Sequence, residues 1–188
     1  SFDSGEVEGS SGLAWYFGYG SLIWRPGFEY QNRMRAVLRG FGRRFWQGSP
    51  DHRGTVETPG RVVTLIPSVD EDCSGVAYWV DPDRDAEVLA YLDHRESGGY
   101  SREIAPITLE DGRSVDAIVY VGREDNPSYL GPAPLKSMAR QIGRSSGPSG
   151  SNLDYLRELS EALKVLNVDD PHVTGLLEQA VKFCTQTE

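Results

Sequence analysis

The order of strand-like and helix-like segments is the feature that most constrains the fold of this chain. Five short segments are rich in β-branched and aromatic residues, as strands are. They span residues 14–19, 61–67, 74–80, 103–109 and 114–121. Asp111-Gly112, between the last two, provides the backbone freedom of a hairpin turn. Strands that precede most of the helices predict an α+β fold, in which helices pack outside a barrel or a strongly curved sheet.

Three helices are predicted from apolar residues that recur every three or four positions. The first begins at Pro82, with Asp81 as its cap. The second has Asn152 as its cap, and the third begins at Pro171. The side chains expected to face the core are Val88, Leu89, Leu92, Leu153, Leu156, Leu159, Leu163, Leu166, Leu176, Leu177, Ala180 and Val181.

Chain length and composition predict one domain. The 188 residues are 38% apolar, which suffices for one core and falls short of what two domains usually need. Residues 1–13 are mainly Gly, Ser and acidic residues and are predicted to be a flexible tail, so the domain spans residues 14–188. No apolar run is long enough to cross a bilayer and no signal-peptide pattern is present, so we expect a cytoplasmic protein without a membrane partner.

Charge and cysteine content argue against several classes of function. The formal net charge of -9 repels polyanions, so nucleic acid is not expected as a partner. Cys73 and Cys184 form no CxxC pair, so no disulfide framework is expected. The three histidines are widely separated in the sequence and do not indicate a metal site.

The segment FGYGSL, residues 17–22, places two glycines just after a predicted strand. A dinucleotide-binding turn would open a helix and would be followed, about twenty residues later, by an acidic residue. Here Pro26-Gly27 interrupts any helix, and no acidic residue lies near Gly40. Two interpretations remain: a plain tight turn, or a turn whose N–H groups converge on a carboxylate or an oxyanion.

Arginines and aromatic residues are mixed in RRFWQGSPDHRG, residues 43–54. Such a mixture can stack nucleic-acid bases, but the acidic charge of the chain disfavours that interpretation. Alternatively, one or more arginines bind the carboxylate of a small ligand, because a guanidinium matches that group in two-point contact. The candidates are Arg43, Arg44, Arg53 and Arg61. For any one of them, simple packing or surface exposure is the favoured interpretation.

The serine-containing motifs indicate neither serine hydrolysis nor phosphate binding. Ser21, Ser49 and Ser149 lie outside any G-x-S-x-G elbow. Residues 147–151 lack the Gly-Lys-Ser/Thr ending of a phosphate-binding loop.

Glu96, in LDHRESGGY, falls where the first predicted helix gives way to Gly98-Gly99. The negative end of the helix dipole favours a protonated carboxyl, and burial would raise its pKa further. A glutamate tuned in this way can take and return a proton near neutral pH. A solvated glutamate at a helix end is the alternative.

Six sequence blocks, in this order, carry a resemblance to a known family. They are FGYGSLIW, RRFWQGSPDHRG, PGRVVTL, YLDHRESGGY, NPSYLGPAP and GPSGSNLDYL. Together they resemble the ChaC family of glutathione-specific γ-glutamylcyclotransferases. The resemblance implies a γ-glutamylcyclotransferase-like fold, a small mixed β-barrel-like sheet flanked by helices. It also implies a carbon–nitrogen lyase that converts reduced glutathione to 5-oxoproline and cysteinylglycine in the cytosol, without metal or cofactor.

The resemblance also assigns site residues. Glu96 matches the catalytic glutamate, and Tyr19 to Leu22 match the substrate-binding loop with the preceding residues as its approach. The expected substrate-binding residues are Tyr16, Phe17, Gly18, Tyr19, Gly20, Ser21 and Leu22. Arg61 and Tyr155 are weaker candidates for the same pocket. Two alternatives stay open: a cyclotransferase for other γ-glutamyl peptides or amines, and a non-catalytic interaction module of the same fold. The sequence does not indicate an oligomeric state.

Overall fold

The computed structural model describes residues 13–185, so the predicted tail, apart from Leu13, lies outside the described residues. Five strands form a closed barrel in the order β1-β3-β2-β4-β5. Neighbouring strands are antiparallel except β1 and β5, which are parallel and close the barrel where Tyr16 pairs with Ile118. The strands are β1 (Trp15–Gly18), β2 (Asn32–Ser49), β3 (Gly60–Trp79), β4 (Ser101–Leu109) and β5 (Ser114–Val121). The predicted α+β fold with a small mixed barrel is confirmed.

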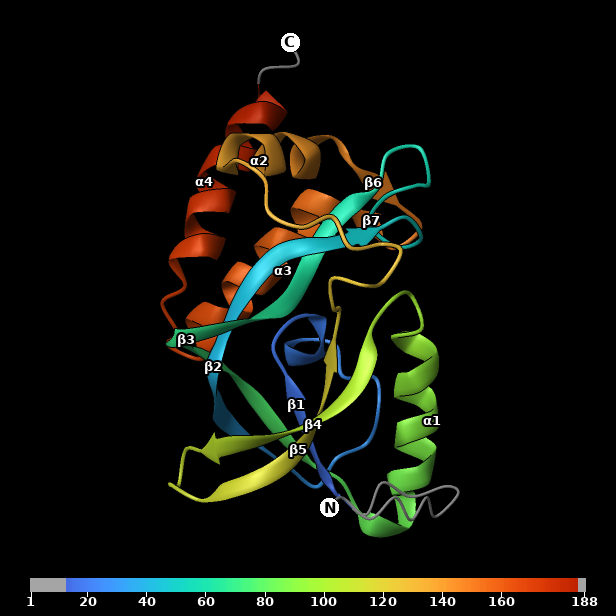
Figure 1. The fold of residues 1–188 in the computed structure, drawn as a ribbon, viewed down its shortest axis with the longest axis vertical. Coiled ribbons are helices and arrows are strands. Elements are labelled where there is room, and N and C mark those ends of the chain that lie inside the picture. Colours follow the sequence, from blue (N-terminus) through green and yellow to red (C-terminus); the bar gives the residue numbers. More distant parts are fainter. Residues whose placement is uncertain (1–12, 186–188) are drawn as a thin grey trace.

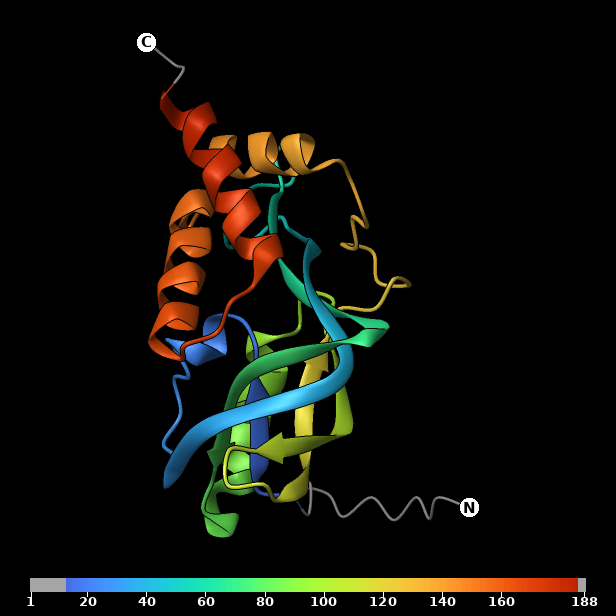
Figure 2. The same ribbon diagram turned by 90° about the vertical axis from the view of Figure 1, so that its left-hand side faces the viewer.

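The helices lie at two places around the barrel (Figure 1). Helix α1 (Asp85–Arg95) lies beside the barrel itself, whereas α2 (Leu135–Arg144), α3 (Asn152–Val165) and α4 (Pro171–Thr185) gather at the other end of the molecule. The long β2–β3 ribbon runs from the barrel into this helical layer, where α4 packs against both α2 and α3 (Figure 2). The short elements are the 3₁₀ turns η1 (Ser21–Ile23) and η2 (Pro82–Arg84) and the strands β6 (Ser146–Gly147) and β7 (Gly150–Ser151).

The two central strands differ most from the sequence-based expectation. No strand was predicted over β2, and β3 was predicted as two strands, at 61–67 and 74–80, where the structure has one. The pairing of β2 with β3 is irregular between Arg39 and Phe41 and again between Arg44 and Gln47. Each bulge shifts the alternation of buried and exposed side chains by one residue, so no single period marks β2 in the sequence.

The local signals at the first helix and at the hairpin are confirmed. The Asp81 side chain accepts a hydrogen bond from the Asp83 N–H, and Pro82 begins a 3₁₀ turn that leads into α1. Gly112 has a φ of +89°, which the turn between β4 and β5 requires and which glycine adopts without strain. Helix α2 was not predicted. It is only 10 residues long, and no side chain caps its first turn.

The predicted cap of α3, Asn152, is wrong. The residue that caps this helix is Ser151. The Ser151 hydroxyl accepts a hydrogen bond from the Asp154 N–H at 3.1 Å. Asn152 is instead fully buried inside the helix start, where its amide pairs with both backbone groups of Arg61. Its Oδ1 accepts from the Arg61 N–H at 2.7 Å and its Nδ2 donates to the Arg61 carbonyl at 2.8 Å. This side chain therefore ties α3 to the start of β3.

We expect Asn152→Ala to lower the free energy of unfolding by about 2 kcal/mol, because it leaves two buried backbone groups without partners. Ser151→Ala, which removes only an exposed cap, should cost about 1 kcal/mol. Urea denaturation of both variants measures the difference. A smaller loss for Asn152→Ala than for Ser151→Ala would contradict this role.

Candidate active site

Two adjoining cavities lie beside the end of α1. The outer cavity has a volume of about 310 Å³ and the inner recess about 40 Å³. Four residues line both of them: Ser21, Glu96, Tyr100 and Tyr155. They come from the turn after β1, the end of α1, the approach to β4 and the first half of α3, so the barrel and the helical layer both contribute to the site.

Glu96 occupies the boundary between the two cavities because of the way α1 ends. Its N–H continues the helix by donating to the Leu92 carbonyl at 2.8 Å, and Leu92 is fully buried in the core. Gly99, with a φ of +113°, then turns the chain back toward β4. The Glu96 side chain is 17% exposed. Burial raises the pKa of its carboxyl, and the guanidinium of Arg95, 3.6 Å away, offsets part of this rise.

Three tyrosines surround the Glu96 carboxyl. The Tyr19 hydroxyl donates to the Tyr120 carbonyl at 2.6 Å, and the Tyr100 hydroxyl donates to the Val63 carbonyl at 2.7 Å. Burial is the main cause that raises the pKa of Tyr19, Tyr100 and Tyr155, and the charge of Glu96 adds to the rise, so all three remain neutral phenols near pH 7. Of these three tyrosines, only Tyr155 has a hydroxyl proton without an acceptor among the described residues. Its oxygen accepts from the Val63 N–H at 3.3 Å.

The turn after β1 contributes Tyr19, Gly20, Ser21 and Leu22 to the lining of the inner recess. Among residues 13–185, the N–H groups of Gly20, Ser21 and Leu22 have no hydrogen-bond acceptor. Arg95 holds this turn by donating from Nη2 to the Ser21 hydroxyl at 3.0 Å and from Nη1 to the Pro26 carbonyl at 3.0 Å. Three free donors beside a partly buried carboxyl form a site for a small ligand that carries an anionic group and a titratable group.

Comparison with known proteins decides the family. The family model described as ChaC-like protein matches residues 14–183. The chain belongs to the ChaC family.

Two curated relatives of this ChaC protein match over about nine tenths of their length. It is 44% identical to glutathione-specific γ-glutamylcyclotransferase 1 of Danio rerio, over 90% of this chain and 89% of the relative. It is 42% identical to γ-glutamylcyclotransferase 2-3 of Arabidopsis thaliana, over 93% of this chain and 92% of the relative. A crystal structure of a yeast γ-glutamyl cyclotransferase specific to glutathione superposes with a TM-score of 0.86 at 34% identity, covering 90% of this chain and 96% of the yeast one. The γ-glutamylcyclotransferase fold is thereby shown.

The predicted loop residues divide into two groups in the ChaC structure. Phe17, Tyr19, Gly20, Ser21 and Leu22 line the inner recess. Tyr16 and Gly18 line neither cavity. The Tyr16 hydroxyl donates to the buried Asp85 carboxylate, and the Gly18 backbone pairs with Val76 in β3. Strand alternation explains the difference for Tyr16, which points to the opposite side of β1 from Phe17.

The two weaker candidates for substrate binding, Arg61 and Tyr155, also differ in position. Tyr155 lines both cavities, whereas Arg61 lines neither. The Arg61 guanidinium donates to the Gln141 side chain at 2.7 Å and to the Phe45 and Gly131 carbonyls, both at 2.9 Å. This buried arginine therefore joins β3 to α2 and to the segment that precedes it.

Of the other arginines considered from the sequence, only Arg53 lines either of these two cavities. Its guanidinium stacks over the Tyr155 ring, 5.7 Å from the ring centre. Arg44 pairs with Glu71 at 2.7 Å, away from both cavities. Arg43 is buried behind the turn after β1.

The serines show no arrangement for nucleophilic attack. The Ser21 hydroxyl accepts from Arg95, and the Ser49 hydroxyl accepts from the Arg53 N–H at 2.9 Å. Ser149 lies 3.3 Å from His52 Nδ1, but this His52 side chain is 62% exposed at the rim of the outer cavity. A base so open to water gives a serine little activation.

Two site residues were missed in the sequence. Arg95 and Tyr100 lie on either side of Glu96 in the RESGGY stretch. Their closeness to Glu96 in the sequence was the only signal that could have identified them as site residues. Their roles depend on contacts with Ser21 and Val63, which lie far away in the chain. Among the described residues, no helix is long and apolar enough to span a membrane, and no group of three metal-ligating side chains is found.

Proposed function

We propose that this protein is a glutathione-specific γ-glutamylcyclotransferase with Glu96 as its general base and acid. The observation that carries the proposal is the Glu96 carboxyl, which has a raised pKa and lies between a recess of free N–H groups and a cavity of about 310 Å³. The names of the relatives from Danio rerio and yeast support glutathione as the substrate.

The reaction removes two protons from the α-nitrogen of the substrate, and the cysteinyl nitrogen gains two, one to leave as an amine and one as the product ammonium. The α-amine of glutathione is an ammonium near neutral pH and becomes a nucleophile when Glu96 removes a proton. The amine then attacks the γ-carbonyl and closes a five-membered ring, and the C–N bond to cysteine breaks. Glu96 gives its proton to the departing cysteinyl nitrogen, and the ring nitrogen, cationic after the attack, loses its second proton, which the released amine takes up as an ammonium; 5-oxoproline and cysteinylglycine result. Because the nucleophile is already tethered to its target, holding the ring-closing conformer replaces covalent catalysis.

The two cavities suit the two halves of the substrate. We place the γ-glutamyl half against the recess, where Gly20, Ser21 and Leu22 offer N–H groups to its α-carboxylate and to the oxyanion of the tetrahedral intermediate. The free Tyr155 hydroxyl proton is a fourth donor. The cysteinylglycine half extends into the outer cavity, where Arg53 and His52 provide groups complementary to a carboxylate.

The direct test is incubation of the purified protein with glutathione and without added metal, followed by mass spectrometry for 5-oxoproline and cysteinylglycine. Formation of both products at equal amounts is the expected result. Intact glutathione after incubation with folded protein would reject the proposal. Parallel rates with γ-glutamyl-alanine test the second candidate, a broader γ-glutamylcyclotransferase, which is favoured by the name of the Arabidopsis relative because that name does not mention glutathione. The cytosolic location stays a prediction.

The pH dependence should report the pKa of Glu96. The base acts only as a carboxylate, so we expect kcat/KM to fall as the pH drops through the raised pKa, at a higher pH than the value of about 4.3 for an ordinary glutamate. In Arg95→Gln the offsetting charge is lost, and the acidic limb should move to still higher pH. Initial rates across the pH range measure the acidic limb of the wild type and that of Arg95→Gln. An acidic limb at the ordinary glutamate pKa would contradict the assignment.

A further inference from the structure

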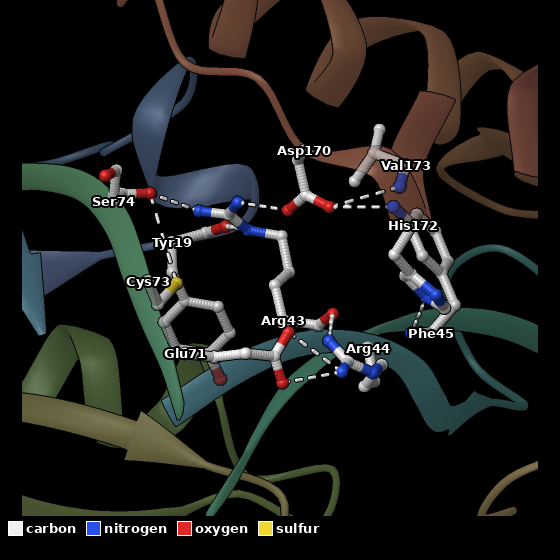
Figure 3. A network of polar contacts seen from close by, with 10 residues as sticks. All are labelled: Tyr19, Arg43, Arg44, Phe45, Glu71, Cys73, Ser74, Asp170, His172 and Val173. Atoms are coloured by element: carbon white, nitrogen blue, oxygen red, sulfur yellow. Dashed lines mark hydrogen bonds and ion pairs between the residues drawn. The ribbon is translucent and has the colours of Figure 1, made fainter. Parts of the chain in front are cut away.

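Arg43 in β2 contacts the turn after β1 without lining the inner recess. It is only 4% exposed and lines neither cavity of the candidate active site. Its Nε donates to the Tyr19 carbonyl at 2.8 Å, and its Nη2 donates to the Ser74 carbonyl (Figure 3). This buried guanidinium thus joins the turn to β3.

The start of α4 holds Arg43 in place. Nη1 donates to Asp170 Oδ2 at 2.7 Å. The other oxygen of Asp170 accepts from the His172 and Val173 N–H groups at 3.1 and 3.3 Å, so one carboxylate caps α4 and pairs with the arginine (Figure 3). All three nitrogens of the guanidinium are engaged, which leaves the group a single orientation.

A planar trans peptide transmits this orientation to the recess. The Tyr19 carbonyl and the Gly20 N–H belong to one peptide group, in which the two point in opposite directions. The carbonyl points at Arg43, behind the turn, so the Gly20 N–H points away from Arg43. Gly20 lines the inner recess, and its N–H has no acceptor among the described residues. The Tyr19 hydroxyl, bonded to the Tyr120 carbonyl, anchors the same residue at its other end.

We propose that Arg43 is a positioning residue that aims the Gly20 N–H at the ligand through its hydrogen bond to the Tyr19 carbonyl. The positive charge also polarises the Tyr19–Gly20 peptide, which strengthens the N–H as a donor. The inference rests on the proposed cyclotransferase function, in which that donor receives the oxyanion or the α-carboxylate. Arg43 does not touch the substrate.

The test compares Arg43→Lys with Arg44→Gln. Lysine keeps the charge near Asp170 but cannot serve three acceptors in fixed directions. Arg44 is the adjacent residue of the same strand, and it pairs with Glu71 without touching the turn. We expect Arg43→Lys to lower kcat/KM for glutathione about tenfold or more. Arg44→Gln should retain the wild-type value. A loss in kcat would assign the Gly20 N–H to the oxyanion, and a rise in KM would assign it to the α-carboxylate.

A spectroscopic readout separates positioning from a general loss of stability. In ¹H–¹⁵N spectra of the Glu96→Gln protein, saturating glutathione should shift the Gly20 amide resonance. This ligand-induced shift should shrink when Arg43→Lys is added, while the melting temperature shows that the protein is folded. If Arg43→Lys does not fold, the test depends on the glutathione-induced shift of the Gly20 amide resonance in Glu96→Gln alone. A Gly20 resonance that glutathione does not move overturns the inference.

The outcomes also separate the two proposals. Wild-type protein that makes no 5-oxoproline defeats the proposed function. Active wild-type protein, together with an Arg43→Lys variant as active as Arg44→Gln, defeats only the positioning role.

Discussion

Glu96→Gln is expected to lower the rate of 5-oxoproline formation from glutathione at least a hundredfold while leaving glutathione bound. Glutamine keeps the shape of the side chain and its hydrogen-bonding reach, but it cannot take a proton from the substrate amine. General acid–base groups contribute about 10²–10⁴-fold to rate, and here one residue serves both proton transfers. Single-turnover kinetics measure the chemical step, and calorimetric titration measures binding. A variant that keeps more than about a hundredth of the activity would contradict the general-base role.

The same substitution should stabilise the protein at neutral pH. The pKa of Glu96 is higher in the folded protein than in the unfolded chain, so the folded state binds the proton more tightly. The free energy of unfolding therefore falls as the pH rises from the unfolded pKa through the folded one, and above that range the charged carboxylate costs stability. Glutamine removes this cost.

Glu103 provides the matched control. The hydrogen bond from Arg123 lowers the pKa of Glu103, which is the opposite direction to Glu96. Glu103→Gln should therefore lose stability near neutral pH and keep its activity, because Glu103 lines neither cavity. Thermal unfolding at several pH values compares the two variants. Equal shifts of the melting temperature in both would refute the assignment of a buried, costly charge to Glu96.

Gly20→Ala is expected to lower kcat/KM about a hundredfold, a change of about 3 kcal/mol that corresponds to one lost oxyanion donor. A Cβ at this position would lie 2.8 Å from Val63 Cγ2 and 3.2 Å from the Tyr155 hydroxyl. Carbon atoms do not approach so closely, and Val63 has a short, stiff side chain within β3. The turn must therefore move, and the N–H groups that line the recess move with it.

A second substitution tests this steric account. Val63→Ala removes the methyl group that the new Cβ would meet, so Gly20→Ala combined with Val63→Ala should recover part of the lost activity. Val63→Ala alone serves as the control for the cavity that it creates. If the double variant is as impaired as Gly20→Ala, the clash with Val63 is not the cause. Steady-state kinetics with glutathione measure kcat/KM for the two single variants and the double variant, provided that their melting temperatures are comparable.

Elements governed by local sequence were predictable. The turn at Gly112 and the beginning of α1 each depend on residues within a few positions of one another, and both were identified. Strand β2 was missed because its two bulges break the alternation of side chains. Asn152 was misplaced as a helix cap because its two hydrogen-bond partners belong to Arg61, which is 91 positions away.

The features of the candidate site are likewise of two kinds, those set by adjacent residues and those set by tertiary contacts. The sequence by itself determined that a glutamate ends a helix and that a glycine-rich turn follows a strand, because both are properties of adjacent residues. Only the tertiary structure decided that they meet, through the Arg95–Ser21 contact across 74 positions. It also decided that Arg53 lines the outer cavity, whereas Arg43 supports the turn from behind. Burial and electrostatic environment arise when distant segments close around a side chain, so the raised pKa of Glu96 is a property of the closed barrel and its helices.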